Sequence, residues 1–285
     1  MKSRELFVLG TLLGAGHLAC AQAPGPVSEK EYLEDMPIVL SVARLPQRID
    51  ETPGSVTVLD RQMIRMSGAR DVVDLLRLVP GFQVSNSFEG GAPQASYHNK
   101  LEIFSSRMQV MVDGRSVYSP YLLGSIGPGL QTVAIEDIER IEVLRGSNSA
   151  AYGARAFLGM INIITRDTVA TQGVQSQIAM GDNGIMDTGV RLGGGDERIS
   201  YRLGLDQRYD KGLSGSSGPD RVNRISFRAD LHPGGADRVE LRAGQTVIDA
   251  NVGFAGQEGN APRTAVTDTS YFQLDWQRNL GPDSA

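Results

Sequence analysis

The chain has 285 residues, of which 40% are hydrophobic and 21% charged, and its formal net charge is −5. This length is sufficient for one large or two ordinary domains with a hydrophobic core, and the composition excludes an intrinsically disordered protein. The basic residues are nearly all arginines and form no basic block, so the charge pattern gives no indication of nucleic-acid binding.

The first residues have the pattern of an export signal. Two basic residues precede an apolar stretch, 6–19, which is too short for a permanent membrane-spanning helix, and a small-x-small sequence ends at Ala21. We therefore expect residues 1–21 to be a signal peptide. His17 stands where a lipoprotein signal has an apolar residue, which disfavours lipidation of Cys20, and cleavage after Ala21 leaves a chain without cysteine.

Residues 22–42 are expected to form a flexible lead. Residues 22–35 are polar and acidic without a sustained period. The following Met-Pro-Ile-Val-Leu-Ser-Val, 36–42, is a short apolar strand-former. By itself this segment is equally compatible with the first strand of the next domain and with a strand that adds to the sheet of a partner.

Two short helices are expected next. Asp60 is an N-cap for a helix that runs to Met66, and a second helix is expected over 69–78, where Pro80-Gly81 ends the pattern. The second helix carries an apolar face, which indicates core packing rather than a ligand site, and its members are Val72, Val73, Leu76 and Val79.

Strands and two long loops follow these helices. Phe82 begins a strand that leads into a loop at 85–94, rich in glycine and small residues. A second strand is expected at 107–112, and the Asp113-Gly114 that follows is a strong hairpin signal. Residues 116–131 contain three glycines and two prolines and are too many for a tight connection, which favours a functional loop.

The segment 138–166 has the most informative residue identities. It reads Ile-Glu-Arg-Ile-Glu-Val-Leu-Arg-Gly-Ser-Asn-Ser-Ala-Ala-Tyr-Gly and, from residue 160, Met-Ile-Asn-Ile-Ile-Thr-Arg. Apolar residues alternate with polar ones, as in strands buried on one face, and Gly146 and Gly153 stand where the chain must turn. The hydrophobic pattern alone predicts an ordinary strand-turn-strand unit of an α+β domain.

The identities add more than the pattern. Together with three earlier landmarks, these identities resemble the plug domain of TonB-dependent outer-membrane receptors. The landmarks, in chain order, are Pro53-Gly54, the Leu-Val-Pro-Gly-Phe that ends at residue 82, and Met111-Val112-Asp113-Gly114. The resemblance covers roughly 39–168. It implies an α+β plug domain at 43–168, a small mixed sheet with short helices, followed by antiparallel strands of a 22-stranded transmembrane β-barrel.

The resemblance also implies a docking segment. In the family, a short hydrophobic segment at this place pairs by edge addition with a strand of the periplasmic protein TonB, which ExbB and ExbD energise. The candidate TonB box consists of Pro37, Ile38, Val39, Leu40, Ser41 and Val42.

Candidate ligand contacts follow from the two long loops, which in the family rise toward the extracellular face. They are Phe88, His98, Arg115, Tyr118 and Tyr121. Tyr97-His98-Asn99 lacks the glycine of the Arg-Gly or His-Gly pair that many members have at the comparable place. In the family, acidic residues of the barrel wall hold an arginine that precedes a glycine, and Arg145 matches this arginine. The resemblance thus makes Arg145 a candidate plug–barrel contact. Where the acidic wall residues are missing, we expect Arg145 to pair locally with Glu139 or Glu142.

Residues 169–285 show recurring alternation with turns between. About six strands are expected, at 172–181, 184–193, 197–208, 222–232, 236–247 and 268–280. A half-exposed sheet of a soluble protein alternates in the same way, but lengths near ten residues and outward aromatic residues are typical of transmembrane barrel strands.

No catalytic motif is present in the sequence, and the three histidines, His17, His98 and His232, are isolated. We therefore expect neither an enzyme nor a bound metal or cofactor. The resemblance implies an outer-membrane receptor, surrounded by lipid, that imports a scarce nutrient, by default a ferric siderophore or other metal chelate. Because six strands cannot enclose a plug, we expect either a fragment of such a receptor or a non-transporting periplasmic or regulatory protein that carries a plug.

Overall fold

The computed structural model describes residues 38–39, 47–49, 54–85, 93–98, 107–118, 125–153, 155–212, 218–234 and 236–279. All of them belong to a single unit of the chain, 37–285. Several expected features lie outside the described residues: the signal peptide, most of the lead, Phe88, Tyr121, and the Pro37, Leu40, Ser41 and Val42 positions of the candidate TonB box.

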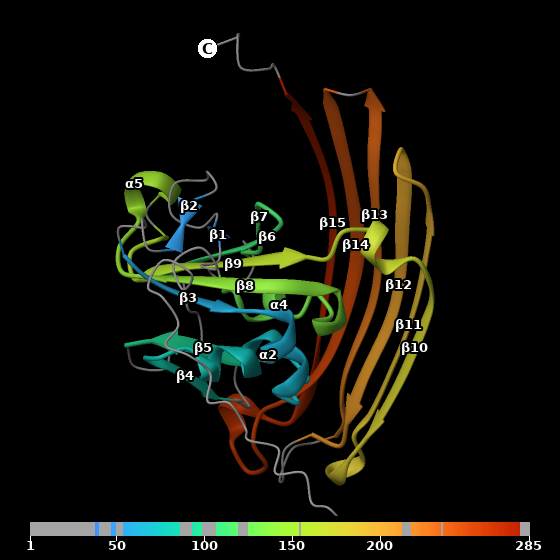
Figure 1. The fold of residues 1–285 in the computed structure, drawn as a ribbon. Coiled ribbons are helices and arrows are strands. Elements are labelled where there is room, and N and C mark those ends of the chain that lie inside the picture. The colour runs from blue at the N-terminus through green and yellow to red at the C-terminus, as the bar shows by residue number, and fades with distance from the viewer. Residues whose placement is uncertain are drawn as a thin grey trace, which may run out of the picture. The chain divides into compact units, whose positions relative to one another are not determined.

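A five-stranded mixed sheet organises the first part of this unit, the α+β domain (described residues of 54–168). Its strands, in sheet order, are β3 (Ser55–Leu59), β8 (Ile138–Arg145), β9 (Gly159–Thr165), β6 (Met108–Val112) and β7 (Arg115–Ser116) (Figure 1). Strands β6 and β9 are parallel, and the other neighbours are antiparallel. The unit expected over 138–166 is the central β8–β9 pair, between which Gly146 and Gly153 have positive φ angles.

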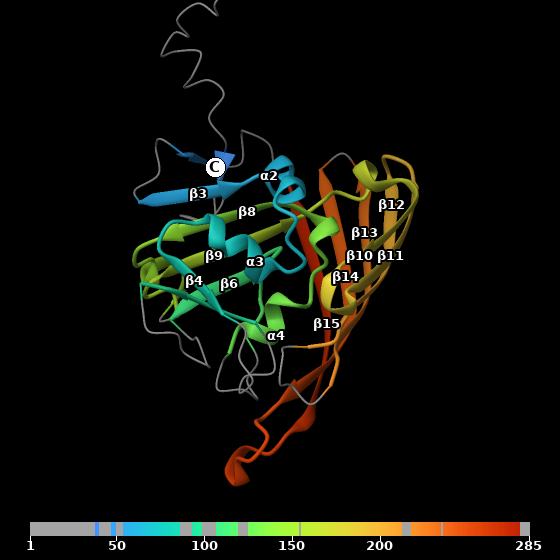
Figure 2. The ribbon, with the colours of Figure 1, turned by 90° about the horizontal axis from the view of Figure 1, so that it is seen from below.

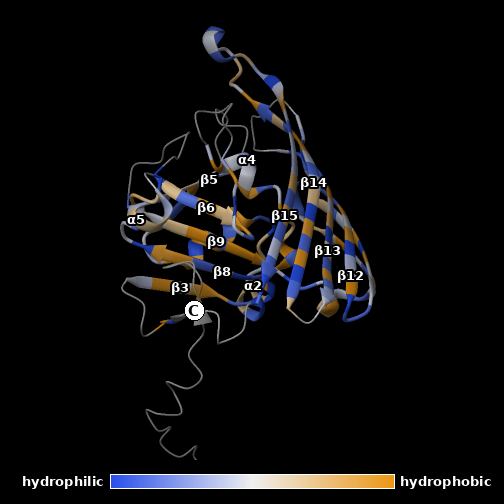
Figure 3. Cartoon of the chain, turned by 90° about the horizontal axis from the view of Figure 1, so that it is seen from above, coloured by the Kyte–Doolittle hydropathy of each residue, from blue (hydrophilic) through white to orange (hydrophobic). Residues whose placement is uncertain are grey.

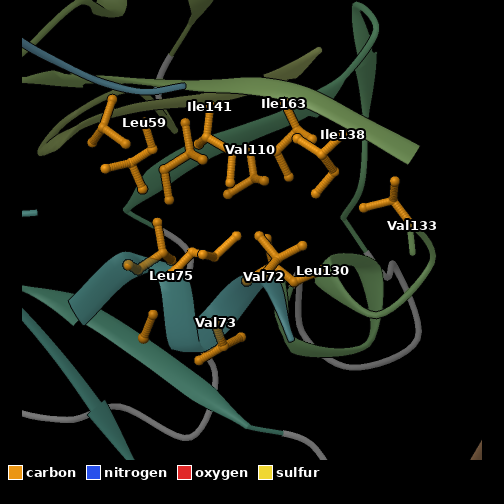
Figure 4. Packing of buried hydrophobic residues seen from close by; sticks show 14 of the residues in the cluster. Leu59, Val72, Val73, Leu75, Val110, Leu130, Val133, Ile138, Ile141 and Ile163 are labelled. Carbon is orange, nitrogen blue, oxygen red and sulfur yellow. The ribbon is translucent and has the colours of Figure 1, made fainter. Parts of the chain in front are cut away.

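Three short helices cover one face of this sheet: α2 (Arg61–Met66), α3 (Val72–Leu75) and α4 (Gly127–Leu130) (Figures 1 and 2). The alternating apolar residues of the strands point toward these helices and are buried against them. In Figure 4 the strand residues Leu59, Val110, Ile138, Ile141 and Ile163 face Val72, Leu75 and Leu130. Each such side chain stabilises the fold by roughly 1.5–3 kcal/mol, so this cluster is the main core of the domain.

The opposite face of the sheet is also covered, whereas the alternation predicted strands buried on one face. Glu142 lies on that second face and is 0% exposed. Its carboxylate accepts hydrogen bonds from Arg140 Nε at 2.9 Å and from Asn162 Nδ2 at 3.4 Å. A charge can be buried here because it is paired and hydrogen-bonded.

The caps define the helices. Asp60 accepts a hydrogen bond from the Met63 N–H at 2.8 Å, and α2 begins directly after it, as expected. The second expected helix, 69–78, is shorter in the structure, since α3 begins only at Val72 and a 3-10 helix, η2 (Leu76–Leu78), completes it. Asp71 has an extended backbone and forms a capping box with Asp74, which fixes the start of the helix.

The Asp113-Gly114 hairpin forms as expected between β6 and β7, with φ angles of 47° and 80°. The segment 116–131 is not entirely a loop, because its end folds into α4, whose residues are all buried. At Gly129 a β-carbon would lie 2.0 Å from the Val117 carbonyl oxygen, so this close approach requires glycine.

Two small antiparallel sheets complete the described domain. β4 (Phe82–Ser85) pairs with β5 (Gln94–Tyr97), and β1 (Ile38–Val39) pairs with β2 (Gln47–Arg48). The strand character expected at 36–42 is therefore found at Ile38–Val39, and the Val39 side chain is buried.

The second part of the unit is a six-stranded antiparallel sheet, here called the wall. Its strands are in chain order, β10 to β15. Their bounds are Gly173–Met180, Met186–Gly195, Ile199–Asp210, Asp220–Gly234, Asp237–Val252 and Arg263–Arg278. Each overlaps one of the six expected strands.

The wall strands alternate between an apolar and a polar face (Figure 3). Large apolar side chains such as Ile178, Leu205, Phe272 and Trp276 are exposed. The alternate positions carry polar and charged side chains, many of them buried. In the described part of the chain, no helix has the length and apolar character needed to cross a membrane.

Candidate functional site at the interface of the domain and the wall

The polar face of the wall presents buried arginines to the α+β domain. Five of them are at most 9% exposed, and they come from four neighbouring strands: Arg191, Arg202, Arg224, Arg228 and Arg242. Strict alternation places them on one face, because the intervening positions carry apolar residues. A buried guanidinium needs a carboxylate or carbonyl partner, and those partners come largely from the α+β domain.

Asp137, directly before β8, accepts from two of these arginines. Its Oδ1 lies 2.7 Å from Arg191 Nε and 3.4 Å from Arg202 Nε. Arg191 also binds Asp206 of the wall at 2.7 Å, and Arg202 donates to the Arg166 carbonyl at 2.9 Å. Asp137 is itself 3% exposed, so the segment that enters β8 is joined to β11 and β12 through buried ion pairs.

Two consecutive residues of opposite charge, Arg70 and Asp71, bind the wall just before α3; we call them the Arg70–Asp71 clamp. Arg70 donates two hydrogen bonds of 2.7 Å to Asp187 and one of 2.9 Å to Asp210. Hydrogen bonding to Asp187 raises the pKa of Arg70. The Asp71 carboxylate lies 2.5 Å from Arg208 and 3.8 Å from Arg224.

The Asp113 turn is a third contact. The Asp113 carboxylate accepts from the Thr165 N–H at 2.9 Å and lies 3.3 Å from Arg242 Nε, while its carbonyl accepts from Gln273 at 2.8 Å. Arg228 donates to Thr165 Oγ1 at 2.9 Å. This turn is thus held by β9 on one side and by the wall on the other.

Between these contacts, a cavity of about 30 Å³ remains, lined by Asp113, Asp137, Arg202 and Arg228 among others. This is the volume of about one water molecule. The centre of the interface is therefore closely packed, and it offers no room for a nutrient molecule in this conformation.

Arg115 and Tyr118, two of the predicted ligand contacts, are engaged within the described structure. The guanidinium of Arg115 stacks over the Tyr271 ring of β15 at 4.0 Å, and burial lowers the pKa of Arg115. Tyr118 donates to the Met108 carbonyl, Arg155 lies over its ring at 3.7 Å, and burial raises the pKa of Tyr118 to about 12. Their role toward a ligand stays a prediction.

His98 and Arg145 lie elsewhere. His98 is exposed after β5, with a φ angle of 44°, and its ring contacts Tyr97 edge-on. Arg145, at the end of β8, donates to Ser55 of the neighbouring strand. Of the two glutamates expected near it, Glu142 binds Arg140, and Glu139 lies 3.9 Å from Arg166. The plug–barrel role of Arg145 also stays a prediction.

The buried ion pairs do not follow from the sequence. The available signal was that arginines such as Arg202 and Arg224 stand on the polar face of the expected strands, opposite the apolar residues. Alternation alone does not say that this polar face is covered. Its partners Asp71, Asp113 and Asp137 are far away in sequence, and of the three only Asp113 was singled out from the sequence, as a turn residue.

Comparison with known families and structures agrees with this architecture. Residues 48–160 match the family model described as TonB-dependent Receptor Plug Domain. Among curated relatives, the chain is 29% identical over 169 residues to the vitamin B12 transporter BtuB of Vibrio vulnificus, covering 58% of this chain and 27% of that protein. It is also 29% identical over 268 residues to the iron-regulated outer membrane virulence protein of Vibrio cholerae, covering 85% of this chain and 40% of that protein.

Solved structures show the same fold. The P. aeruginosa protein FpvA bound to heterologous pyoverdines superposes with a TM-score of 0.70 at 15% identity, over 86% of this chain and 34% of FpvA. The ferric yersiniabactin uptake receptor FyuA of Yersinia pestis gives a TM-score of 0.64 at 18% identity, over 79% of this chain and 38% of FyuA. The chain thus spans between about a quarter and two fifths of the length of these proteins.

Proposed function

Because this chain carries a TonB-dependent receptor plug domain followed by part of a barrel, we propose that it acts within an outer-membrane receptor for energy-coupled uptake of a scarce nutrient. The observation that carries the proposal is the interface just described, in which an α+β plug is fastened by buried ion pairs to the polar face of amphipathic strands. Such ion pairs hold a plug in place, and the plug can be released when these polar contacts rearrange, without any covalent chemistry.

The connections between the wall strands support an outer-membrane location. The connections from β11 to β12 (196–198) and from β13 to β14 (235–236) are short, whereas those from β12 to β13 (211–219) and from β14 to β15 (253–262) are longer. Outer-membrane barrels have short periplasmic turns and longer extracellular loops, and their outward face contacts lipid. We assign the two longer connections to the extracellular side, and the exposed apolar face of the wall to lipid. The signal peptide expected at 1–21 provides the export route.

The nutrient we propose is a metal chelate, with a ferric siderophore as the first candidate. The relatives named above include an iron-regulated outer-membrane protein and a ferric yersiniabactin uptake receptor, but also a vitamin B12 transporter, so cobalamin is the second candidate. Phe88, His98, Arg115, Tyr118 and Tyr121 stay the proposed contacts.

We propose TonB as the energy-coupling partner, with ExbB and ExbD behind it, and 37–42 as its docking segment. Strand β1 lies within this segment and already pairs with β2, in the register Ile38↔Arg48 and Val39↔Gln47. The segment is thus able to form strand pairs, which is the capacity that edge addition to a TonB strand requires.

A crosslinking experiment tests this partner. Val39→Pro removes a backbone N–H and should strongly reduce crosslinking of the chain to the C-terminal domain of TonB, whereas Val39→Ala keeps the N–H and should crosslink as the wild type does. Undiminished crosslinking of Val39→Pro would remove the docking role of this segment.

The clamp and the sheet order suggest how a pull on the docking segment acts on the plug. Strand β3 is an edge strand, paired only with β8 within its sheet, in a register that runs from Ser55↔Arg145 to Leu59↔Ile141. A pull from the N-terminal side loads the Ser55 end first, so the pairs open one after another. The next ion pairs with the wall along the chain are those of the Arg70–Asp71 clamp. We infer that the clamp limits how much of the plug a moderate pull releases.

A further inference from the structure

A polar groove runs between the plug and the first two wall strands, outside the closely packed interface. Its volume is about 610 Å³, and β10 forms one side. The charged residues that line it are Arg61 and Arg65 of α2, Glu136, Glu139, Arg166 and Arg191. We call it the arginine groove. Arg191 is already paired with Asp137 and Asp206, so the other three guanidinium groups of the lining face two carboxylates, Glu136 and Glu139.

The partners of these arginines leave an excess of positive charge. Arg61 donates to two backbone carbonyls, of Ile135 at 3.0 Å and Ile138 at 2.8 Å. Burial lowers the pKa of Arg61, and the charge of Arg166 lowers it further, whereas Glu136 and Glu139 raise it. Arg65 is exposed and has no hydrogen-bond or ion-pair partner among the residues that the structure describes.

The two glutamates are already engaged or distant. Glu136 lies 3.4 Å from Arg191, which also binds Asp137 and Asp206. Glu139 lies 3.9 Å from Arg166 Nε, beyond hydrogen-bonding distance. Arg166 donates instead to the Ala170 carbonyl at 3.0 Å. Arg61, Arg65 and Arg166 thus keep donors for a further acceptor.

The opposite side of the groove supplies neutral donors. Gln175 pairs in register with Arg191, and Gln177 with Gly189, so both glutamines lie on the face of β10 that carries Arg191 in β11. Their neighbours Val174 and Ile178 are exposed on the other face. Side-chain amides and guanidinium groups together are typical donors to carboxylate and phosphate oxygens.

We propose that the arginine groove binds a soluble oxyanion, a carboxylate or phosphate group of a ligand that enters between plug and wall. The inference rests on the proposed function, since a receptor is the setting in which a nutrient reaches this place. It extends that function in two ways: it places a ligand-binding site away from the two long loops, and it assigns an anionic chemical class to the ligand. Arg65 and Arg166 contact the oxyanion, Arg61 adds positive charge beneath it, and Gln175 and Gln177 orient it.

Inorganic phosphate is the probe that tests the groove. Binding to the purified, folded chain is measured by calorimetry, and the site is located from the shifts of the arginine Nε–H signals in NMR spectra. Arg65→Gln should weaken phosphate binding about tenfold, because it removes one charge-assisted hydrogen-bond donor. Arg77→Gln is the matched control, because Arg77 is an exposed arginine at 59% on η2 and does not line the groove.

Equal affinities of Arg65→Gln and the wild type, or equal losses in both variants, would overturn the proposal. So would binding to vesicles containing phosphatidylglycerol without binding of inorganic phosphate, because the ligand would then be a lipid headgroup. Phosphate binding does not involve TonB, so a negative result here is distinguishable from failure of the TonB crosslinking experiment.

Discussion

At the scale of single residues, the interface depends on carboxylates that serve more than one cation. Asp137 is the clearest case, since it is buried and accepts from both Arg191 and Arg202. Removing one partner of a buried ion pair is costly, because the other charge remains without compensation.

We therefore expect Asp137→Asn to destabilise the folded chain by about 3–5 kcal/mol. Equilibrium unfolding in urea, in detergent micelles, measures this loss. Asp182→Asn is the control, because Asp182 is exposed in the short 3-10 helix after β10, and its replacement should change the free energy of unfolding by less than about 0.5 kcal/mol. Similar effects of the two substitutions would contradict a shared role for Asp137.

Tyr118 provides a pH-dependent observation. Burial raises its pKa from 10.0 to about 12, so its hydroxyl stays protonated at pH 11 in the folded chain, whereas it ionises near pH 10 in the unfolded chain. A raised folded-state pKa contributes stability that is fully present below pH 10 and is lost as the pH rises through 12. The phenolate absorbance of the wild type minus that of Tyr118→Phe should therefore rise with its midpoint at about pH 12; a midpoint near pH 10 would show that Tyr118 is not buried.

At the scale of elements, much was predictable from local signals. The Asp60 cap, the Asp113-Gly114 hairpin, the β8–β9 unit and the six wall strands each have short-range or periodic patterns, and the structure contains them all. The predicted start of α3 was wrong by three residues, because Asp71 caps the helix and the apolar face of the helix does not reveal this cap. Helix α4 was missed, since its Gly-Pro-Gly-Leu sequence favours a loop and only tertiary burial stabilises it.

The packing of α4 against Val117 gives a prediction for this element. Gly129→Ala would place a β-carbon 2.0 Å from the Val117 carbonyl oxygen, so the helix must move, and we expect a loss of about 1–3 kcal/mol in the free energy of unfolding. At Gly259, in the loop between β14 and β15, nothing lies within 4 Å of an added β-carbon. Gly259→Ala should thus be neutral, and neutrality of both variants would contradict the packing of α4.

The clamp predicts a mechanical stop. A chain held at residue 259, in the loop between β14 and β15, through Gly259→Cys and pulled from residue 38 should release 38–69 and then pause. The released segment corresponds to about 110 Å of extended chain. In Arg70→Ala the pause should disappear or move to a longer extension. Arg77→Ala, which removes an exposed arginine six residues after Asp71, is the control and should keep it. A pause at the same extension in all three chains would contradict the role of Arg70.

At the scale of the whole molecule, the sequence indicated which two parts are present but not how they are fastened. The plug followed from particular identities in 138–166, and the wall from period-two alternation. The ion pairs between them join residues 54 to 153 positions apart, such as Arg191 with Asp137 and Arg224 with Asp71. No local pattern encodes such pairs. The candidate ligand residues came from loop composition, and the buried interface came only from the three-dimensional structure.

The central claim is that the plug is bound to the wall through specific ion pairs, and a double-mutant cycle on Arg70 and Asp187 tests it most directly. Arg70→Ala, Asp187→Ala and the double variant should give a coupling energy of at least about 1.5 kcal/mol in urea unfolding. The control cycle uses Arg278 and Asp237, a more exposed pair within the wall at 3.1 Å, for which we expect about 0–1 kcal/mol. A coupling energy for Arg70 and Asp187 no larger than that of the control would show that the plug is not held by this contact.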